Sequence, residues 1–200
     1  MLLEFYVEEP SAEAALIHLV PAILAEADFE FEIYPFQGKN DLIRKLPNRL
    51  SAYKHWIADD QRIIVLVDRD DDDCYQLKNN LERIALNAGL ETRSTIPAKF
   101  HIINRIAIEE LEAWFFGDVP AMKLAYPRIP ESLGQKAAYR NPDAVHGGTW
   151  ERLQQVLKDY HPGGLEKIRA AEEISKYMDP DNNRSRSFQV FRDALRSIFE

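Results

Sequence analysis

Five carboxylates follow directly on an aliphatic run in the middle of the chain, at Asp68 and at Asp70 to Asp73. Carboxylates this close together repel one another and are costly unless water or a cation neutralises them. A hard divalent cation does so through oxygen ligands, and Mg²⁺ prefers one or two carboxylates while keeping several waters. Asp68 and Asp70 leave the same predicted strand end, and they therefore predict a Mg²⁺ or Mn²⁺ site.

A further carboxylate, Glu8, follows the first predicted strand. In a parallel α/β sheet the ligand site lies at the carboxyl ends of the strands, where both Glu8 and Asp68 fall. Phosphoryl transfer uses such a metal to neutralise developing charge and to orient the attacking water. We therefore predict Glu8, Asp68 and Asp70 as catalytic and metal-binding residues. Asp72 is a further candidate ligand, although Asp71 to Asp73 also suit the cap and first turn of the next helix.

Hydrophobic periodicity predicts the elements that position these residues. A helix begins near Ala12 with Ser11 as its N-cap and is kinked or interrupted at Pro21. Pro47 divides the helical pattern of residues 41–57, a third helix covers residues 73–88 with Gly89 as its stop, and a fourth opens near residue 107. The predicted strands cover residues 2–7, 29–34, 63–67, 90–96 and 100–103.

This alternation of strands and helices predicts an α/β fold, with a mostly parallel sheet and helices on both of its faces. After Asp118 the strand signals end, and helical patterns follow. We expect an α/β domain over residues 1–118, with a helical C-terminal extension over residues 119–200 packed on it. The predicted helices of this extension cover residues 119–126, 150–160, 165–178 and 187–199.

The order of Glu8 after a strand, Glu13 on the following helix and Asp68-x-Asp70 after a buried strand resembles the Toprim catalytic domain. That domain occurs in topoisomerases, bacterial primases and nucleases of the overcoming-lysogenisation-defect (OLD) type. The resemblance covers about residues 1–118 and implies a metal-dependent phosphodiester-cleaving activity. It also implies that Glu13 is a further metal ligand. The chain has Glu9 and Pro10 where Toprim members commonly have glycine.

A resemblance over nearly the whole chain is to domain-of-unknown-function family 4276, which is regarded as Toprim-like. The similarity to OLD-like two-component systems implies a role in phage defence with an ATPase partner. The segments that carry the family resemblance are residues 7–9, 38–42, 66–70, 105–114 and 183–188.

Other polar residues suggest weaker sites. Glu109 and Glu112 are three residues apart on a predicted helix, and they could supply a second metal site or a solvated border. Lys39 follows a glycine and is a candidate phosphate contact, without the rest of a nucleotide-binding loop. Arg184 and Arg186 are candidate phosphate contacts or part of a basic loop before a helix. The five histidines and the single cysteine show no zinc-binding spacing.

Charge separates two main function hypotheses. The formal net charge is −8, and residues 1–118 carry 12 basic against 22 acidic residues. The first hypothesis is a Toprim-type nuclease acting on DNA or RNA. The second is a non-catalytic module for an ATPase partner, which the shortage of basic charge favours. A haloacid-dehalogenase-type phosphatase ranks last, because its Asp-x-Asp motif normally follows the first strand.

Cysteine content and hydropathy predict the cellular setting. One cysteine excludes an internal disulfide framework, and no apolar stretch approaches the roughly 20 residues that span a bilayer. The start of the chain shows no secretory signal. We therefore expect a cytoplasmic protein without a membrane association.

Overall fold

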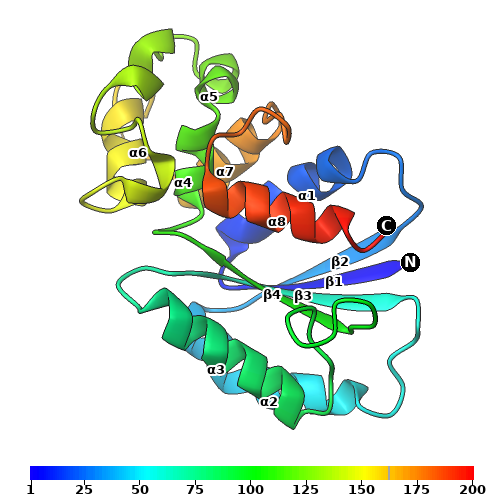
Figure 1. The fold of residues 1–200 in the computed structure, drawn as a ribbon. Helices are drawn as coiled ribbons and strands as arrows, with labels where there is room; N and C mark the ends of the chain where they lie inside the picture. Colours follow the sequence, from blue (N-terminus) through cyan, green and yellow to red (C-terminus); the bar gives the residue numbers. More distant parts are fainter. Residues whose placement is uncertain (162) are drawn as a thin grey trace. The chain divides into compact units, whose positions relative to one another are not determined.

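The computed structural model describes residues 1–161 and 163–200, and Figure 1 shows its helices and strands. The chain forms two compact units. The first contains residues 1–10 and 27–106, and the second contains residues 11–26 and 107–200. The boundary predicted at residue 118 falls inside the second unit.

A four-stranded parallel sheet organises the first unit, with the strand order β2-β1-β3-β4. Its register places Val7, the last residue of β1, between Pro35 of β2 and Leu66 of β3. The carboxyl ends of β1 and β3 therefore meet at one edge, and the α/β class predicted from sequence is confirmed. The strands are β1 (Leu2–Val7), β2 (Glu30–Pro35), β3 (Gln61–Asp68) and β4 (Ile102–Ala107).

Strand position explains the two kinds of strand sequence. β3 lies inside the sheet, and its continuous aliphatic run is buried along nearly its whole length. β2 lies at the edge, and its residues alternate between exposed and partly buried. The sequence patterns of continuous and alternating hydrophobicity therefore reflect burial on two faces and on one face.

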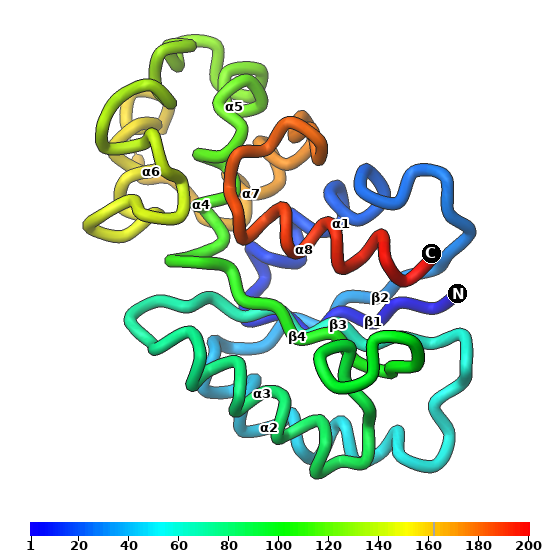
Figure 2. Tube along the Cα trace, in the orientation of Figure 1, coloured from blue at the N-terminus to red at the C-terminus, as the bar shows by residue number. Residues whose placement is uncertain are grey.

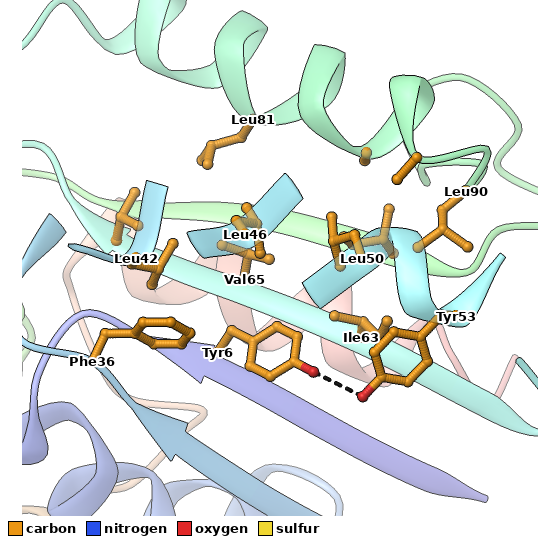
Figure 3. Close-up of a cluster of buried hydrophobic side chains, with 14 of the residues drawn as sticks. Tyr6, Phe36, Leu42, Leu46, Leu50, Tyr53, Ile63, Val65, Leu81 and Leu90 are labelled. Carbon is orange, nitrogen blue, oxygen red and sulfur yellow. Dashed lines mark hydrogen bonds between the residues drawn. The ribbon is translucent and has the colours of Figure 1, made fainter. Parts of the chain in front are cut away.

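Helices α2 (Lys39–Tyr53) and α3 (Cys74–Asn87) lie side by side on one face of the sheet (Figure 1). Their apolar stripes pack on side chains of β1 and β3, and together these form the core of the first unit (Figure 3). The fully buried core residues include Leu42, Leu46, Leu50, Ile63, Val65, Leu81, Ala85 and Ile102.

Both ends of α3 are capped as the sequence predicts. The side chain of Asp73 accepts a hydrogen bond from the backbone N–H of Gln76 at 2.8 Å. At the other end Gly89 has φ 79°, and Leu90 N–H donates to the Ala85 carbonyl. This is the Schellman arrangement, in which a glycine adopts the left-handed conformation at little cost. At least one carboxylate of the acidic run therefore has a structural role.

The strand predicted over residues 90–96 is wrong. Thr92 makes only an isolated bridge to Ile102, and the segment forms a compact coil before β4 (Figure 2). The hydroxyl of Thr95 donates to the Thr92 carbonyl at 2.9 Å, and Thr95 N–H donates to the same carbonyl at 3.0 Å. Local side-chain hydrogen bonds of this kind compete with a sheet ladder.

Three predicted helix boundaries also differ. Pro47 lies inside an uninterrupted α2, because the buried stripe of that helix continues on both sides and offsets the lost hydrogen bond. Helix α1 (Pro10–Ile23) starts at Pro10, which suits a first helical position, so Ser11 is not its N-cap. β4 continues to Ala107, and the helix expected there starts only at Glu112.

Helices dominate the second unit, as the sequence predicts for its C-terminal part. Trp114 is fully buried, and its ring packs against the rings of Phe188 and Phe191, with ring centroids 5.2 and 5.0 Å apart. No helix in the described part of the chain is long and apolar enough to cross a membrane. Beside α1, the unit contains α4 (Glu112–Gly117), α5 (Val119–Ala125), η1 (Glu131–Gln135), η2 (Pro142–Ala144), α6 (Thr149–Leu157), α7 (Lys167–Ser175) and α8 (Arg186–Arg196).

Candidate functional site

The carboxyl ends of β1 and β3 bring Glu8 and Asp68 together. The backbone N–H of Asp68 donates to Glu8 Oε2 at 3.0 Å. Asp68 is only 7 % exposed, and Glu8 is partly buried. Two acidic residues that are 60 residues apart in sequence are therefore joined, main chain to carboxylate, at the sheet edge where α/β proteins place their ligands.

The N-terminus of α2 closes this edge. Gly38 precedes the helix with φ 94°, a conformation that favours glycine, and its N–H donates to the Glu8 carbonyl at 2.9 Å. Burial raises the pKa of the Glu8 carboxyl group, while hydrogen bonds from the backbone of Asp68 and Lys39 act in the opposite direction. The negative charge of Asp70 raises this pKa further.

The ammonium group of Lys39 lies among four oxygens of the acidic loop. It donates to the main-chain carbonyls of Asp68 and Arg69 at 3.0 and 3.1 Å. It also pairs with the carboxylates of Asp70 and Asp72, each at 2.7 Å. This arrangement, the Lys39 cradle, neutralises two of the acids that the sequence groups together.

The side chains of the Lys39 cradle differ in their exposure to solvent. The Lys39 side chain is 12 % exposed, whereas those of Asp70 and Asp72 are about half exposed. Burial lowers the pKa of Lys39, but the hydrogen bonds to Asp70 and Asp72 outweigh it and the net shift is upward. Asp70 has φ 49°, an uncommon conformation outside glycine that is frequent at functional sites. The loop is therefore held in a specific shape around a positive charge.

The four oxygens of the Lys39 cradle are also of the chemical types that bind a divalent metal. Carboxylate and main-chain carbonyl oxygens are the ligands that hard cations prefer. In the arrangement described, Lys39 already neutralises Asp70 and Asp72. Among residues 1–161 and 163–200, no three His, Cys, Asp or Glu side chains are grouped so that they could hold a metal ion. A metal at these oxygens would therefore have to exchange with the ammonium group.

Removing the ammonium group should make the acidic loop dependent on divalent cations. We expect Lys39→Met to lower the free energy of unfolding by about 1–2 kcal/mol in EDTA, because charge-assisted hydrogen bonds are lost. Millimolar Mg²⁺ should restore much of this loss by binding the folded state. Thermal denaturation with EDTA and with Mg²⁺ measures both effects.

Lys45→Met provides the matched control, since it removes another lysine of α2 that pairs with Asp41 instead. It should show no such dependence on Mg²⁺. Identical Mg²⁺ responses of wild type and Lys39→Met would contradict the exchange between lysine and metal.

The remaining predicted metal ligands lie in the second unit. Glu13 is in the first turn of α1. Glu112 is the first residue of α4 and fully buried, and Lys167 Nζ lies 3.7 Å from its carboxylate. Glu109 precedes the helix with φ 60°, so the prediction that Glu109 and Glu112 share a helical face is wrong. A metal role for these three glutamates stays a prediction.

The basic segment near the C-terminus holds the second unit together. Asn183 donates to the Trp114 carbonyl at 2.8 Å, and Ser187 Oγ accepts from Trp114 Nε1 at 2.9 Å. Arg184 donates to the Gly134 carbonyl at 3.2 Å, and Arg186 donates to Gln189 Oε1 at 3.4 Å, although both arginines are exposed. A phosphate contact by either arginine stays a prediction, and the described contacts of Arg184 are structural.

Asp143 anchors this segment, and sequence reasoning missed it. Its carboxylate accepts hydrogen bonds from Ser185 Oγ at 2.6 Å, and from the backbone N–H and Oγ of Ser187 at 3.0 and 3.1 Å. We expect Asp143→Ala to lower the free energy of unfolding by about 2–3 kcal/mol, because buried donors lose their acceptor. Urea denaturation measures this, with Asp159→Ala at an exposed position as the control. Equal losses in both variants would contradict the anchor.

Two other interactions join residues that are far apart in the chain, so neighbouring residues in the sequence do not predict them. The carboxylate of Glu110 accepts from Thr149 Oγ1 at 2.7 Å and from Trp150 N–H at 2.9 Å, so it caps the N-terminus of α6. The partners are 39 and 40 residues away in the chain. Lys39, a predicted phosphate contact, pairs with the distant carboxylates of Asp70 and Asp72, and its contact with a phosphate stays a prediction.

Comparison with known proteins gives one match. The family described as Domain of unknown function (DUF4276) matches residues 7–196, which is nearly the whole chain. Neither the curated proteins nor the solved structures contain a significant match.

Proposed function

The chain belongs to the DUF4276 family, and on that premise we propose that it is a Mg²⁺- or Mn²⁺-dependent enzyme that cleaves phosphodiester bonds of nucleic acid. The meeting of Glu8 and Asp68 at neighbouring strand ends carries this proposal. Acidic residues in this position, together with Asp70, belong to the set that the Toprim resemblance assigns to metal-dependent chemistry, and Asp72 is a further candidate ligand.

Each residue has a distinct role in the proposed reaction. Asp68, Asp70 and Asp72 would hold the metal, which when bound neutralises charge on the phosphate and orients the attacking water. Glu8 has a raised pKa, which brings its carboxyl group closer to neutral pH and suits proton transfer to or from a reacting oxygen. Lys39, once it exchanges with the metal, supplies a positive charge for a phosphate oxygen.

Cleavage assays with defined metals test the proposal. Purified protein is incubated with single-stranded and double-stranded DNA and with RNA, in EDTA, Mg²⁺ or Mn²⁺. We expect cleavage only with a divalent metal, and its loss in Glu8→Gln. The absence of cleavage on all substrates with each metal, or equal cleavage by Glu8→Gln, would overturn the proposal.

A second candidate is a non-catalytic module that binds an ATPase partner. The Lys39 cradle favours it, because an internal cation stabilises Asp70 and Asp72 without any metal. This candidate predicts a stable complex with an ATPase and no divalent-metal binding by calorimetry. A location in the cytoplasm and a role in phage defence stay predictions from the sequence.

A further inference from the structure

The first unit contains a pocket of about 390 Å³ beside α2, outside the acidic site. Its size falls within the range of small-ligand pockets. Aromatic and cationic side chains share its wall, in contrast to the acidic strand ends. The lining includes Tyr6, Lys45, Asn48, Arg49, Tyr53 and Trp56.

The aromatic wall of the pocket combines buried rings with an exposed one. Tyr53 is nearly buried, and its hydroxyl lies 2.8 Å from Tyr6 Oη (Figure 3). The same hydroxyl donates to Glu4 Oε1 at 2.8 Å. Trp56 stacks on Tyr53 with ring centroids 4.6 Å apart and is still 60 % exposed. The Trp56 ring therefore offers a flat surface to a ligand, while Tyr53 packs against its other face.

The polar wall comes from one face of α2. Lys45, Asn48 and Arg49 are spaced three and four residues apart, so they lie on the same side of the helix. Lys45 pairs with Asp41, while no hydrogen bond or ion pair of Arg49 is found within residues 1–161 and 163–200. Apart from Lys39 in the Lys39 cradle, α2 has three basic residues and one acidic residue in a protein of net charge −8. Its exposed face is thus a local cationic patch.

The same helix connects this patch to the acidic site. Lys39 at the start of α2 lies in the Lys39 cradle, and Tyr53 at its end lines the pocket. Fourteen residue steps at about 1.5 Å each separate the two by roughly 20 Å. An extended polyanion that contacts Lys45 and Arg49 could therefore reach toward both ends.

We propose that the pocket binds a nucleotide of single-stranded nucleic acid, with the base stacked on Trp56 and the phosphate held by Arg49 and Lys45. The inference rests on the proposed function and names its substrate class. Base stacking on exposed aromatic rings combined with basic side chains is the usual way in which proteins bind single strands. In a duplex, paired and stacked bases present no free face to Trp56, so the pocket selects unpaired strands or a free nucleotide.

Binding in EDTA tests the site without cleavage. The probe is a 12-nucleotide oligothymidine DNA with a 5′ fluorescent label, followed by anisotropy. We expect Trp56→Ala to weaken binding by about 5- to 150-fold, the usual effect of losing one stacked base. Trp56→Phe should retain most of the affinity, because a stacking ring remains. Tyr75→Ala is the matched control, since Tyr75 is an exposed aromatic residue on α3, and it should bind like wild type.

Salt dependence tests the phosphate contact separately. Arg49→Gln should reduce the slope of log affinity against log salt by about 0.7, the value for one phosphate contact with a single strand. Arg83→Gln on α3 removes one exposed positive charge outside the pocket and should leave the slope unchanged. Equal slopes for wild type and Arg49→Gln would overturn the assignment of the phosphate contact.

Competitors distinguish a strand from a free nucleotide. Displacement of the probe by thymidine monophosphate, but not by inorganic phosphate at equal ionic strength, assigns the site to a single nucleotide. Displacement only by unlabelled oligonucleotide assigns it to a strand. Tighter binding of a 12-base-pair duplex, or probe binding that Trp56→Ala leaves unchanged, would overturn the proposal.

Parallel cleavage assays separate this inference from the proposed function. Binding that requires Trp56 in a protein that cleaves no substrate would retain the nucleotide site and overturn the enzymatic proposal. Metal-dependent cleavage of single strands that is indifferent to Trp56→Ala would do the reverse.

Discussion

Replacing Asp68 by Asn is expected to lower the proposed metal-dependent phosphodiester cleavage by about 10²- to 10³-fold. A metal ligand that stabilises transition-state charge contributes several kcal/mol, and each 1.36 kcal/mol corresponds to a factor of ten in rate. Asp68 ends β3, and its backbone N–H contacts Glu8, so the substitution changes the ligand charge and leaves that contact in place. Initial rates on a labelled oligonucleotide with Mn²⁺ measure the effect.

The matched control is Asp71→Asn, at an exposed position of the same acidic run. It removes the same charge from the same loop, and it should retain most of the activity. A rate for Asp68→Asn within about threefold of wild type, with the fold intact by circular dichroism, would exclude Asp68 as a catalytic ligand. Equal losses in both variants would mean that the overall negative charge matters and not the strand-end position.

Replacing Trp114 by Ala is expected to lower the free energy of unfolding by about 3–5 kcal/mol, the usual cost of removing a large aromatic side chain from a core. Its ring contacts Phe188 and Phe191, and its indole N–H donates to Ser187 Oγ. The substitution would therefore leave a cavity in the second unit and remove the hydrogen bond that Ser187 Oγ accepts from the indole. Urea denaturation followed by far-ultraviolet circular dichroism measures the loss.

Trp56→Ala is the control for this experiment, because the chain offers the same residue type at an exposed position. Trp56 is 60 % exposed and Trp114 is fully buried, so the control should cost far less stability. A loss below about 1 kcal/mol in Trp114→Ala would contradict the role of Trp114 in the core of the second unit. A stable Trp56→Ala protein also makes its nucleotide-binding measurement interpretable.

Much of the first unit could be predicted from its sequence because the signals are local. The aliphatic run before Asp68 indicated an interior strand, and Asp73 and Gly89 marked the two ends of α3. Residues 90–96 misled the prediction, since Thr92 and Thr95 bond within their own turn. Local patterns report burial reliably, but they do not report whether a side chain satisfies its own backbone.

The C-terminal basic segment shows a different limit. Arg184 and Arg186 alternate with serines, a pattern that suggests a phosphate contact. In the fold, Ser185 and Ser187 bond to Asp143, and Arg184 donates to main-chain carbonyls. The partners come from more than 40 residues away, so no local pattern could identify them.

The acidic end of β3 depends on both the local sequence and the tertiary structure. The sequence by itself determined that Asp68 and Asp70 leave an interior strand and that Glu8 ends another, because strand burial and strand ends are encoded in neighbouring residues. Only the tertiary structure decided which groups surround them. Parallel pairing brings Glu8 to Asp68, and the packing of α2 on the sheet inserts Lys39 among the acids, 29 residues before Asp68 in the chain. An ion pair between residues far apart in the chain forms only when whole helices and strands pack together. The spacing of residues in the sequence therefore does not predict it.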